Sequence, residues 1–296
     1  MSVLLLFIDG LGLGTRGQHN PLDGLTDATP LAVFENEIPS LPNDGALAIT
    51  DARLGIAGRP QSASGQTTIL TGINAPAAIG YHKQGFPNQA LLEIIRTNSI
   101  FLQLKNLGIE PNIFANTYTN RFLETRPRWI SATTAAVEAA ELQFNTLEDL
   151  HAGRSLFHDF TNRSLIERGE KADIRTPEEA ADVLANIVAN HRFTLYEYFM
   201  TDKAGHAQDF NAARSILIAL GKFITQLLSR IDLAKTTVVL TSDHGNIEDL
   251  STRSHTLNPV PTMVWGLYRE TAKQRITSLV DITPTIVSLL TRAQRA

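Results

Sequence analysis

The chain has 296 residues, enough for one large domain or for a core with a smaller insertion, at about 150 residues per domain. It has 26 Lys and Arg against 30 Asp and Glu, a net charge of −4, which argues against a dedicated nucleic-acid-binding protein with its basic surface. Cysteine is absent, so disulfides, thiolate nucleophiles and cysteine-held metals are excluded, and any metal must be held by His, Asp or Glu.

Short apolar runs and helical patterns alternate along the chain. The runs predict strands at residues 3–8, 46–50, 112–115, 193–200, 236–241 and 262–265. The helical patterns cover residues 89–96, 100–107, 177–190, 212–231 and 282–290, and Thr176 followed by Pro177 predicts the start of one of these helices. Continuous apolar strands that alternate with helices indicate an α/β fold, with a mostly parallel central sheet covered by helices on both faces.

Residues 117–175 break this alternation. They are richer in Arg, Thr and Asn, so we expect a small cap, or substrate-specificity insertion, within a core formed by residues 1–116 and 176–296. The apolar run at residues 3–8 is short, has no preceding Lys or Arg, and therefore makes a poor signal peptide. No apolar stretch approaches the roughly 18 to 20 residues of a membrane span, so we expect a cytoplasmic protein without a membrane partner.

Three aspartates follow predicted strands. Asp9 comes directly after the first strand, Asp202 after the fourth, and Asp243 after the fifth. In an open parallel sheet, ligands bind outside the carboxyl ends of the strands, so the three carboxylates are expected to converge. Each alone is more often a turn or cap aspartate, but a converging set would repel and desolvate itself without a cation. The pattern therefore predicts a metal site.

Three of the eight histidines accompany these aspartates. His206 is four residues after Asp202, on the same face if this segment begins a helix, and His244 directly follows Asp243. His255 lies in a proline-stiffened loop before the last predicted strand. Mixed His and carboxylate donors suit Zn²⁺ or Mn²⁺ best, with Mg²⁺ an alternative, and the donors suffice for two ions.

A candidate nucleophile lies in the hydroxyl-rich loop at residues 58–68, which leads into a predicted short helix. A serine at a helix N-terminus and beside a metal would have a more acidic hydroxyl, and the helix dipole would favour phosphate there. For Ser62 or Ser64 taken alone, helix capping is the more common role. The loop lacks the lysine of a Walker A motif.

Taken in order, these motifs resemble the alkaline phosphatase superfamily, most closely its branch of cofactor-independent phosphoglycerate mutases and phosphopentomutases. The resemblance covers roughly residues 1–80 and 195–291. Its motifs are Phe7-Ile8-Asp9-Gly10, Ser62-Ala63-Ser64-Gly65, Asp202-x-x-Gly205-His206, Asp243-His244-Gly245-Asn246 and His255-Thr256-x-Asn258-x-Val260-Pro261.

The resemblance implies two metal sites and a serine nucleophile. One ion would be held by Asp202, His206 and His255, and the other by Asp9, Asp243, His244 and the hydroxyl of Ser62. Ser62 would attack a small phosphate ester and form a phosphoserine, with Lys203 as a candidate phosphate contact. Arg121, Arg126 and Arg128 in the predicted cap are candidates for substrate binding, with a solvated surface as the alternative.

The type of reaction stays open between a phosphatase, a phosphomutase and a phosphodiesterase. Gln66 stands where the mutases carry a histidine, and the predicted cap is shorter than the mutase cap that keeps water from the phosphoenzyme. Both features favour a phosphatase. A protein in which the ions are only structural is the alternative from another class. The sequence does not indicate an oligomeric state.

Overall fold

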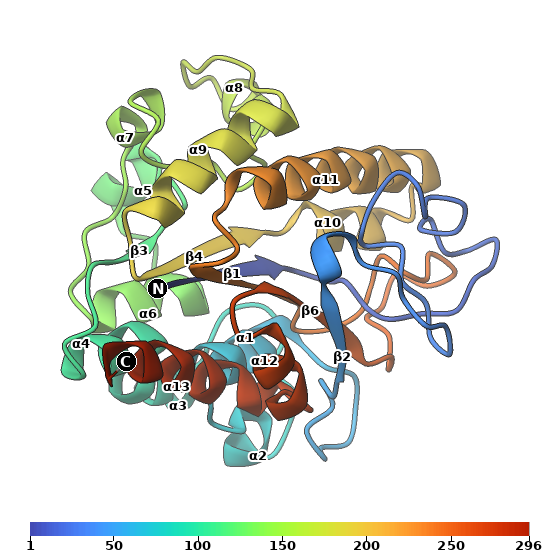
Figure 1. The fold of residues 1–296 in the computed structure, drawn as a ribbon, viewed down its shortest axis with the longest axis horizontal. Coiled ribbons are helices and arrows are strands. Elements are labelled where there is room, and N and C mark those ends of the chain that lie inside the picture. Colours follow the sequence, from blue (N-terminus) through green and yellow to red (C-terminus); the bar gives the residue numbers. More distant parts are fainter. Residues whose placement is uncertain (296) are drawn as a thin grey trace.

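A computed structural model describes residues 1–295, and in it one six-stranded sheet lies between two layers of helices (Figure 1). The sheet order is β2-β6-β5-β1-β4-β3. All six predicted strands are confirmed, within two residues at each end. Their bounds are β1 Ser2–Ile8, β2 Ala46–Thr50, β3 Asn112–Phe114, β4 Phe193–Tyr198, β5 Thr236–Thr241 and β6 Val260–Gly266.

The direction of β6 departs from the otherwise parallel arrangement. Strands β1, β3, β4 and β5 run parallel, whereas β6 is antiparallel to β5 and β2 is antiparallel to β6. Five strands therefore share one direction, which confirms the mostly parallel sheet. Because β6 runs the opposite way, the loop before it lies at the edge where the other strands end.

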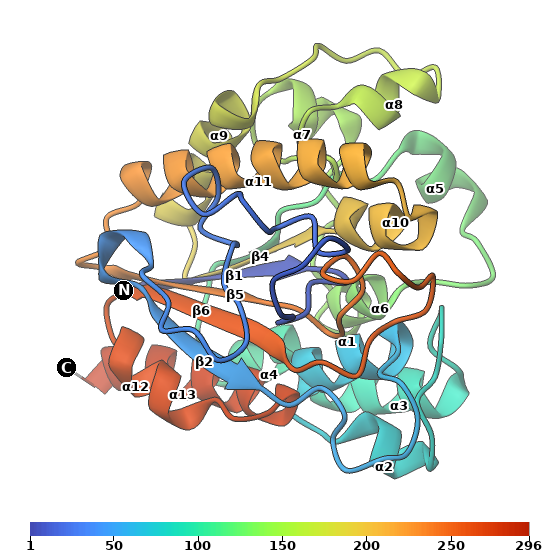
Figure 2. The same ribbon diagram turned by 90° about the vertical axis from the view of Figure 1, so that its right-hand side faces the viewer.

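Alternate side chains of β1 belong to two separate cores. Leu4, Leu6 and Ile8 pack in the core on the side of α9 (Pro177–Ala189) and α11 (Phe210–Arg230). Val3, Leu5 and Phe7 pack in the core on the opposite face. Figure 2 shows the two helical layers above and below the sheet. The helices of the second layer are α1 Ser62–Thr71, α3 Gln89–Asn98, α4 Ile100–Asn106, α6 Ala132–Ala139, α12 Arg269–Arg275 and α13 Ile282–Arg295, with the short α2 Ala75–Ile79 beside them.

Helix α11 is long and apolar enough, by length and composition, to cross a membrane. In this fold its residues Leu217, Leu220 and Phe223 are fully buried in the core, and the helix packs along α9. The apolar side of α11 therefore faces the core of this fold.

Helix α1 corrects the prediction of a loop at residues 58–68. The segment from Ser62 to Thr71 is one helix and is almost entirely buried. The hydroxyls of Thr67, Thr68 and Thr71 donate hydrogen bonds of 2.6, 2.8 and 2.7 Å to the carbonyl oxygens four residues earlier. These bonds satisfy the buried hydroxyls, so a polar segment without apolar periodicity forms a core helix.

The predicted cap contains four helices, which are α5 Asn120–Thr125, α6, α7 Leu147–His151 and α8 Arg163–Glu167. Helix α6 packs against α1, α3 and α4 and so completes the second helical layer. Around α7 and α8, residues Leu147, Leu150, Phe157 and Leu165 form a small cluster of their own. The role of residues 117–175 as a cap remains a prediction.

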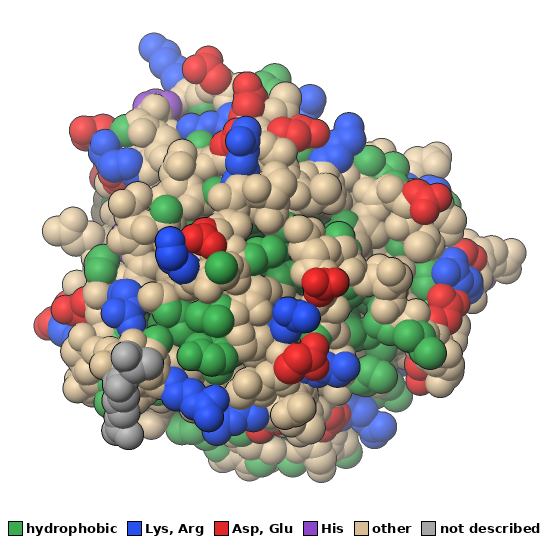
Figure 3. Space-filling view, in the orientation of Figure 1, with side chains coloured by type: hydrophobic (Ala, Val, Ile, Leu, Met, Phe, Trp, Pro, Cys, Tyr) green, Lys and Arg blue, Asp and Glu red, His purple; other side chains and the backbone are tan. Residues whose placement is uncertain are grey.

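Charged side chains of both signs are interspersed over the face shown in Figure 3. Exposed ion pairs join Arg230 to Asp182 at 2.8 Å and Lys235 to Asp232 at 3.1 Å. This face therefore carries no continuous basic surface.

Candidate metal centre

The three predicted aspartates meet at the edge where the strands end. Asp9 directly follows β1, Asp243 follows β5 by two residues, and Asp202 lies in the first turn of α10 (Met200–Ala207), just after β4. The expected pairing along α10 is present, because His206 Nε2 lies 3.4 Å from Asp202 Oδ2. Gly10 allows the chains to approach, since a Cβ at this position would lie 2.8 Å from the Cα of Asp202.

One group of potential metal ligands consists of Asp9, Asp243 and His244. The Nε2 atom of His244 lies 3.3 Å from Asp9 Oδ1 and 3.4 Å from Asp243 Oδ2. One donor atom from each of the three residues lies within 4.8 Å of the others, and all three side chains are buried. This group matches the protein ligands expected for one ion, apart from the hydroxyl of Ser62.

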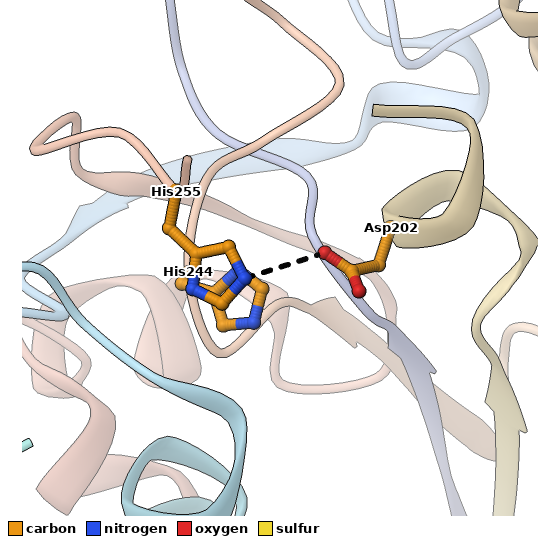
Figure 4. Close-up of side chains that lie close together, drawn as sticks. All are labelled: Asp202, His244 and His255. Atoms are coloured by element: carbon orange, nitrogen blue, oxygen red, sulfur yellow. Dashed lines mark ion pairs between the residues drawn. The ribbon is translucent and has the colours of Figure 1, made fainter. Parts of the chain in front are cut away.

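A second group consists of Asp202, His244 and His255 (Figure 4). His255 Nε2 lies 3.6 Å from Asp202 Oδ1, and the imidazole rings of His255 and His244 stack with their centroids 3.6 Å apart. His206 borders this group, with its Nε2 atom 3.3 Å from that of His255. His255 reaches the site because β6 is antiparallel, so the loop that precedes it lies beside the ends of the parallel strands.

Backbone carbonyls orient all three histidines. The Nδ1 atoms of His206 and His255 lie 2.6 and 2.9 Å from the carbonyl oxygens of Arg253 and Pro60, and Nδ1 of His244 lies 3.4 Å from that of Gly245. An Nδ1–H that donates to a carbonyl leaves Nε2 as a free electron-pair donor. This is the usual arrangement of histidines that bind metal ions.

The electrostatics of the buried carboxylates also fit a cation. Burial and the neighbouring Asp243 hold the pKa of Asp9 well above its ordinary value, and burial and Asp202 do the same for the pKa of Asp243. The Oδ1 atoms of Asp9 and Asp243 are buried and have no hydrogen-bond partner among the described residues. Burial lowers the pKa of His244, which keeps its ring neutral. Unpaired carboxylate oxygens beside a neutral imidazole form a suitable donor set for divalent cations.

Ser62, the candidate nucleophile, lies beside His244. It is the first residue of α1, and its Oγ atom lies 3.0 Å from Nε2 of His244. Gly65, one turn later, permits this position, because a Cβ there would lie 2.9 Å from the Cβ of Asp243. Ser64 has a different environment, since its hydroxyl donates to the carbonyl of Gln61 and accepts a hydrogen bond from the N–H of Lys83.

Sequence reasoning missed Glu248, which joins three loops of the site. Its carboxylate accepts hydrogen bonds from the N–H of Gly12 at 2.9 Å and the N–H of Asn246 at 2.8 Å. It also accepts hydrogen bonds from the side chains of Thr256 and Asn258, on either side of Leu257. The only available signal was an acid two residues after Asn246, which by itself does not distinguish this role from a solvated surface position.

Two further buried residues border the metal ligands. The amide Nε2 atom of Gln66 lies 3.5 Å from Asp9 Oδ2 and 3.4 Å from Asp243 Oδ2. Glu197, on β4, accepts a hydrogen bond of 2.9 Å from Thr133, and burial raises its pKa to about 7. Glu197 lies within an apolar strand, where no motif singled it out.

The other candidate residues belong to neither ligand group. The ammonium of Lys203 lies 5.1 Å from the ring centre of Phe199. Arg126 pairs with Glu138 at 2.7 Å, and Arg128 lies over the ring of Trp129. Arg121 lies on α5 and is exposed. The roles of Lys203, Arg121, Arg126 and Arg128 in substrate binding remain predictions.

The fold is similar to that of alkaline phosphatases, and two groups of potential metal ligands lie at one edge of its sheet. Residues 157–294 match the family model described as the Metalloenzyme superfamily. The 2,3-bisphosphoglycerate-independent phosphoglycerate mutase of Paracoccus denitrificans is 32% identical over 125 residues, which cover 40% of this chain and 24% of that protein. The match to the mutase of Ehrlichia canis is 26% identical and covers 40% of this chain and 26% of that protein, so the chain spans about a quarter of these relatives.

Solved structures share the fold over nearly the whole chain. The alkaline phosphatase of the Antarctic bacterium TAB5 has a TM-score of 0.53 at 14% identity, with 98% of this chain and 97% of that chain covered. The PH0037 protein of Pyrococcus horikoshii has a TM-score of 0.56 at 12% identity, with the same coverage. These findings confirm the predicted resemblance to alkaline phosphatase-like metalloenzymes.

Proposed function

We propose that this protein is a dimetal-dependent phosphoryl-transfer enzyme that acts on a small phosphate ester through a phosphoserine at Ser62. The observation that carries the proposal is the position of the Ser62 hydroxyl, 3.0 Å from His244 Nε2 and at the start of α1. His244 belongs to both groups of potential metal ligands, so the hydroxyl adjoins both. A purely structural metal site would have no need for a serine at this point.

The surroundings of Ser62 suit attack on phosphorus. The N–H groups of Ser62 and Ala63, in the first turn of α1, have no intrahelical partners, and the positive end of the helix dipole favours a phosphoryl group there. In the reaction, the bond from Ser62 Oγ to phosphorus forms as the bond from phosphorus to the ester oxygen breaks. The serine proton passes to solvent, and the departing alcohol gains one from solvent. Water then attacks the phosphorus of the phosphoserine, the bond from phosphorus to Oγ breaks, and inorganic phosphate leaves as the serine hydroxyl is regenerated.

This arrangement differs from a Ser-His-Asp triad. In a triad, the carboxylate holds Nδ1 of the histidine while Nε2 faces the serine. Here Asp9, Asp243 and Ser62 all lie on the Nε2 side of His244, and Nδ1 lies near the carbonyl of Gly245. The convergence on a single nitrogen favours metal binding over proton transfer.

The two ligand groups share His244, and the proposal divides the remaining residues between two ions. One would be held by Asp9, Asp243, His244 and Ser62, and the other by Asp202 and His255, with His206 beside them. Bound there, Mn²⁺ or Zn²⁺ would stabilise charge on the attacking and leaving oxygens, with Mg²⁺ an alternative. Gln66 supports the first group by directing its amide toward both aspartates.

We favour hydrolysis over phosphomutase activity because Gln66 replaces the mutases' histidine and the insertion at residues 117–175 is short. A phosphomutase is the second candidate, since the curated relatives carry that name. Phosphodiesterase activity is the third alternative. A screen of aryl phosphates, sugar phosphates and phosphoglycerates, with release of inorganic phosphate and formation of isomers both followed, separates the first two. Isomer formation without phosphate release would overturn the preference for hydrolysis.

The nucleophile is tested with two neighbouring serines. Ser62→Ala should abolish turnover of an aryl phosphate while the circular dichroism spectrum stays unchanged. Ser64→Ala is the matched control, because the Ser64 hydroxyl in α1 is hydrogen-bonded to the backbone of Gln61 and Lys83, and this variant should retain turnover. Substantial turnover by the Ser62→Ala variant would reject the proposal.

A further inference from the structure

A cavity of about 370 Å³ that is rich in aromatic side chains is lined on one side by Glu197 of β4 and by Phe199. This volume lies in the range of small-molecule sites, about 300–1,000 Å³. Seven of the 20 Phe, Tyr and Trp residues of the chain line it. Six of these are Phe114, Tyr118, Phe122, Trp129, Phe157 and Phe199.

The cavity adjoins the metal ligands through two of its lining residues. Phe199 directly precedes α10, so it lies three residues before Asp202. Glu197 also lines the cavity, and the carbonyl oxygen of the next residue, Tyr198, accepts a hydrogen bond of 2.9 Å from the N–H of Asp9. The cavity therefore lies beside the end of β4, from which the chain continues to Asp202.

His158 supplies an observation independent of the apolar lining. Its ring is 7% exposed and stacks on that of Phe199, with the ring centres 3.9 Å apart. His158 lines the cavity, and both of its ring nitrogens are buried and have no hydrogen-bond partner among the described residues. Buried polar atoms in native structures normally have partners, so this pair is available to a bound molecule.

Two cations lie near aromatic residues that line the same cavity. Arg168 lines it and lies 5.7 Å from the ring centre of Phe157. Lys203 lies over Phe199, next in sequence to the ligand Asp202. An anionic ester entering the site would meet positive charge at the border between the cavity and the metal ligands.

We propose that this cavity binds the leaving group of the substrate, and that this group is an aromatic or heteroaromatic ring with a polar substituent facing His158. The inference rests on the proposed phosphoryl transfer and names its substrate class. Stacking between aromatic rings supplies the attraction, and the two nitrogens of His158 supply the preference for a polar ring edge.

Binding is measured by calorimetry with non-hydrolysable phosphonates in the presence of Zn²⁺, so the result does not depend on turnover. Phenylphosphonate should bind about tenfold or more tightly than methylphosphonate. Trp129, 57% exposed at the cavity, should report the ring by a change in fluorescence, whereas Trp265 is fully buried. Equal affinities for the two phosphonates would overturn the inference.

Variants locate the bound ring. Trp129→Ala with Phe86→Ala, two half-exposed lining residues, should reduce the preference for phenylphosphonate about three- to tenfold. Leu107→Ala, a half-exposed apolar residue outside the cavity, should leave it unchanged. In the wild-type protein, 4-hydroxyphenylphosphonate should bind more tightly than phenylphosphonate, because its hydroxyl faces His158. His158→Phe keeps a ring against Phe199 and should abolish only this difference in affinity. A preference unaffected by all of the cavity variants would also overturn the inference.

The two proposals fail separately. If the wild-type protein forms phosphoserine at Ser62 but shows no preference for the phenyl group, the cavity inference is wrong and the proposed function stands. If the Ser62→Ala variant keeps its turnover, the proposed function is wrong whatever the phosphonates do. Phosphonate titration of the wild-type protein therefore tests the cavity, and turnover by Ser62→Ala tests the proposed function.

Discussion

Ser62 Oγ lies 3.0 Å from Nε2 of His244, although 182 positions separate the two residues along the chain. The contact depends on two local features. Helix α1 starts at Ser62 and approaches the loop after β5 closely because Gly65 has no side chain. His244 is held with Nε2 toward the serine by the buried aspartates on either side of that nitrogen.

Asp243→Asn should have opposite effects on stability in the absence and in the presence of metal, because Asp243 is one of the buried aspartates. In the presence of a chelator, Asp243→Asn should raise the free energy of unfolding by about 1 kcal/mol, because one of two facing buried carboxyl groups is removed. With Zn²⁺ at about a hundred times its dissociation constant, the wild-type protein should gain about 2.7 kcal/mol per site, and the variant clearly less.

Urea unfolding with and without Zn²⁺ measures both effects. Asp232→Asn, in an exposed ion pair with Lys235, is the control and should respond to Zn²⁺ as the wild-type protein does. A Zn²⁺-dependent gain as large in Asp243→Asn as in the wild-type protein would show that Asp243 is not a ligand.

Glu197 should make the metal-free protein less stable as the pH rises. Burial raises its pKa from 4.5 to about 7, so the folded state binds this proton more tightly than the unfolded chain does. The contribution of Glu197 to the free energy of unfolding is fully present below about pH 4.5 and is lost as the pH rises through about 7. The total loss is about 3 kcal/mol.

The variant Glu197→Gln should lose this part of the pH dependence, because glutamine does not titrate and can still accept the hydrogen bond from Thr133. Relative to the wild-type protein, it should be more stable at pH 8 than at pH 5. The measurement is urea unfolding across this pH range in a chelator. Parallel pH profiles for the two proteins would mean that Glu197 does not titrate as described.

Glu248 should hold the metal ligands in position. In Glu248→Gln, an amide NH₂ replaces an oxygen that faces N–H and O–H donors, so about 2 kcal/mol of stability should be lost. The loops that carry Asp243 and His255 should then be less well fixed, and affinity for Zn²⁺ should fall about tenfold. Calorimetric titration with Zn²⁺ measures this, with the exposed Glu270→Gln as control. Unchanged Zn²⁺ affinity in Glu248→Gln would show that the loops hold their geometry without it.

Local sequence patterns were enough to predict the strands and the aspartates that follow three of them. Each strand is an apolar run, and Asp9, Asp202 and Asp243 follow three of these strands closely, so their convergence could be inferred from the parallel sheet. The capping box of Thr176 and Glu179, with the Thr176 hydroxyl accepting from the N–H of Glu179 at 3.1 Å, confirms the predicted start of α9.

Other features depend on contacts between distant segments. The direction of β6 follows from its pairing with β5 and β2, and no residue within the strand encodes it. Helix α1 has no apolar periodicity because its hydroxyls are satisfied internally and it is buried on nearly all sides. Glu248 and Glu197 acquire their roles only from the loops and helices that fold around them.

The central claim is most directly tested by trapping the phosphorylated protein. The Zn²⁺- or Mn²⁺-loaded protein is mixed with an aryl phosphate, quenched in acid, and analysed by peptide mass spectrometry. We predict one added phosphoryl group, at Ser62, in the wild-type protein and in Ser64→Ala, and none in Ser62→Ala. Turnover of the same ester with no phosphoserine at Ser62, or with the phosphoryl group on another residue, would contradict the account.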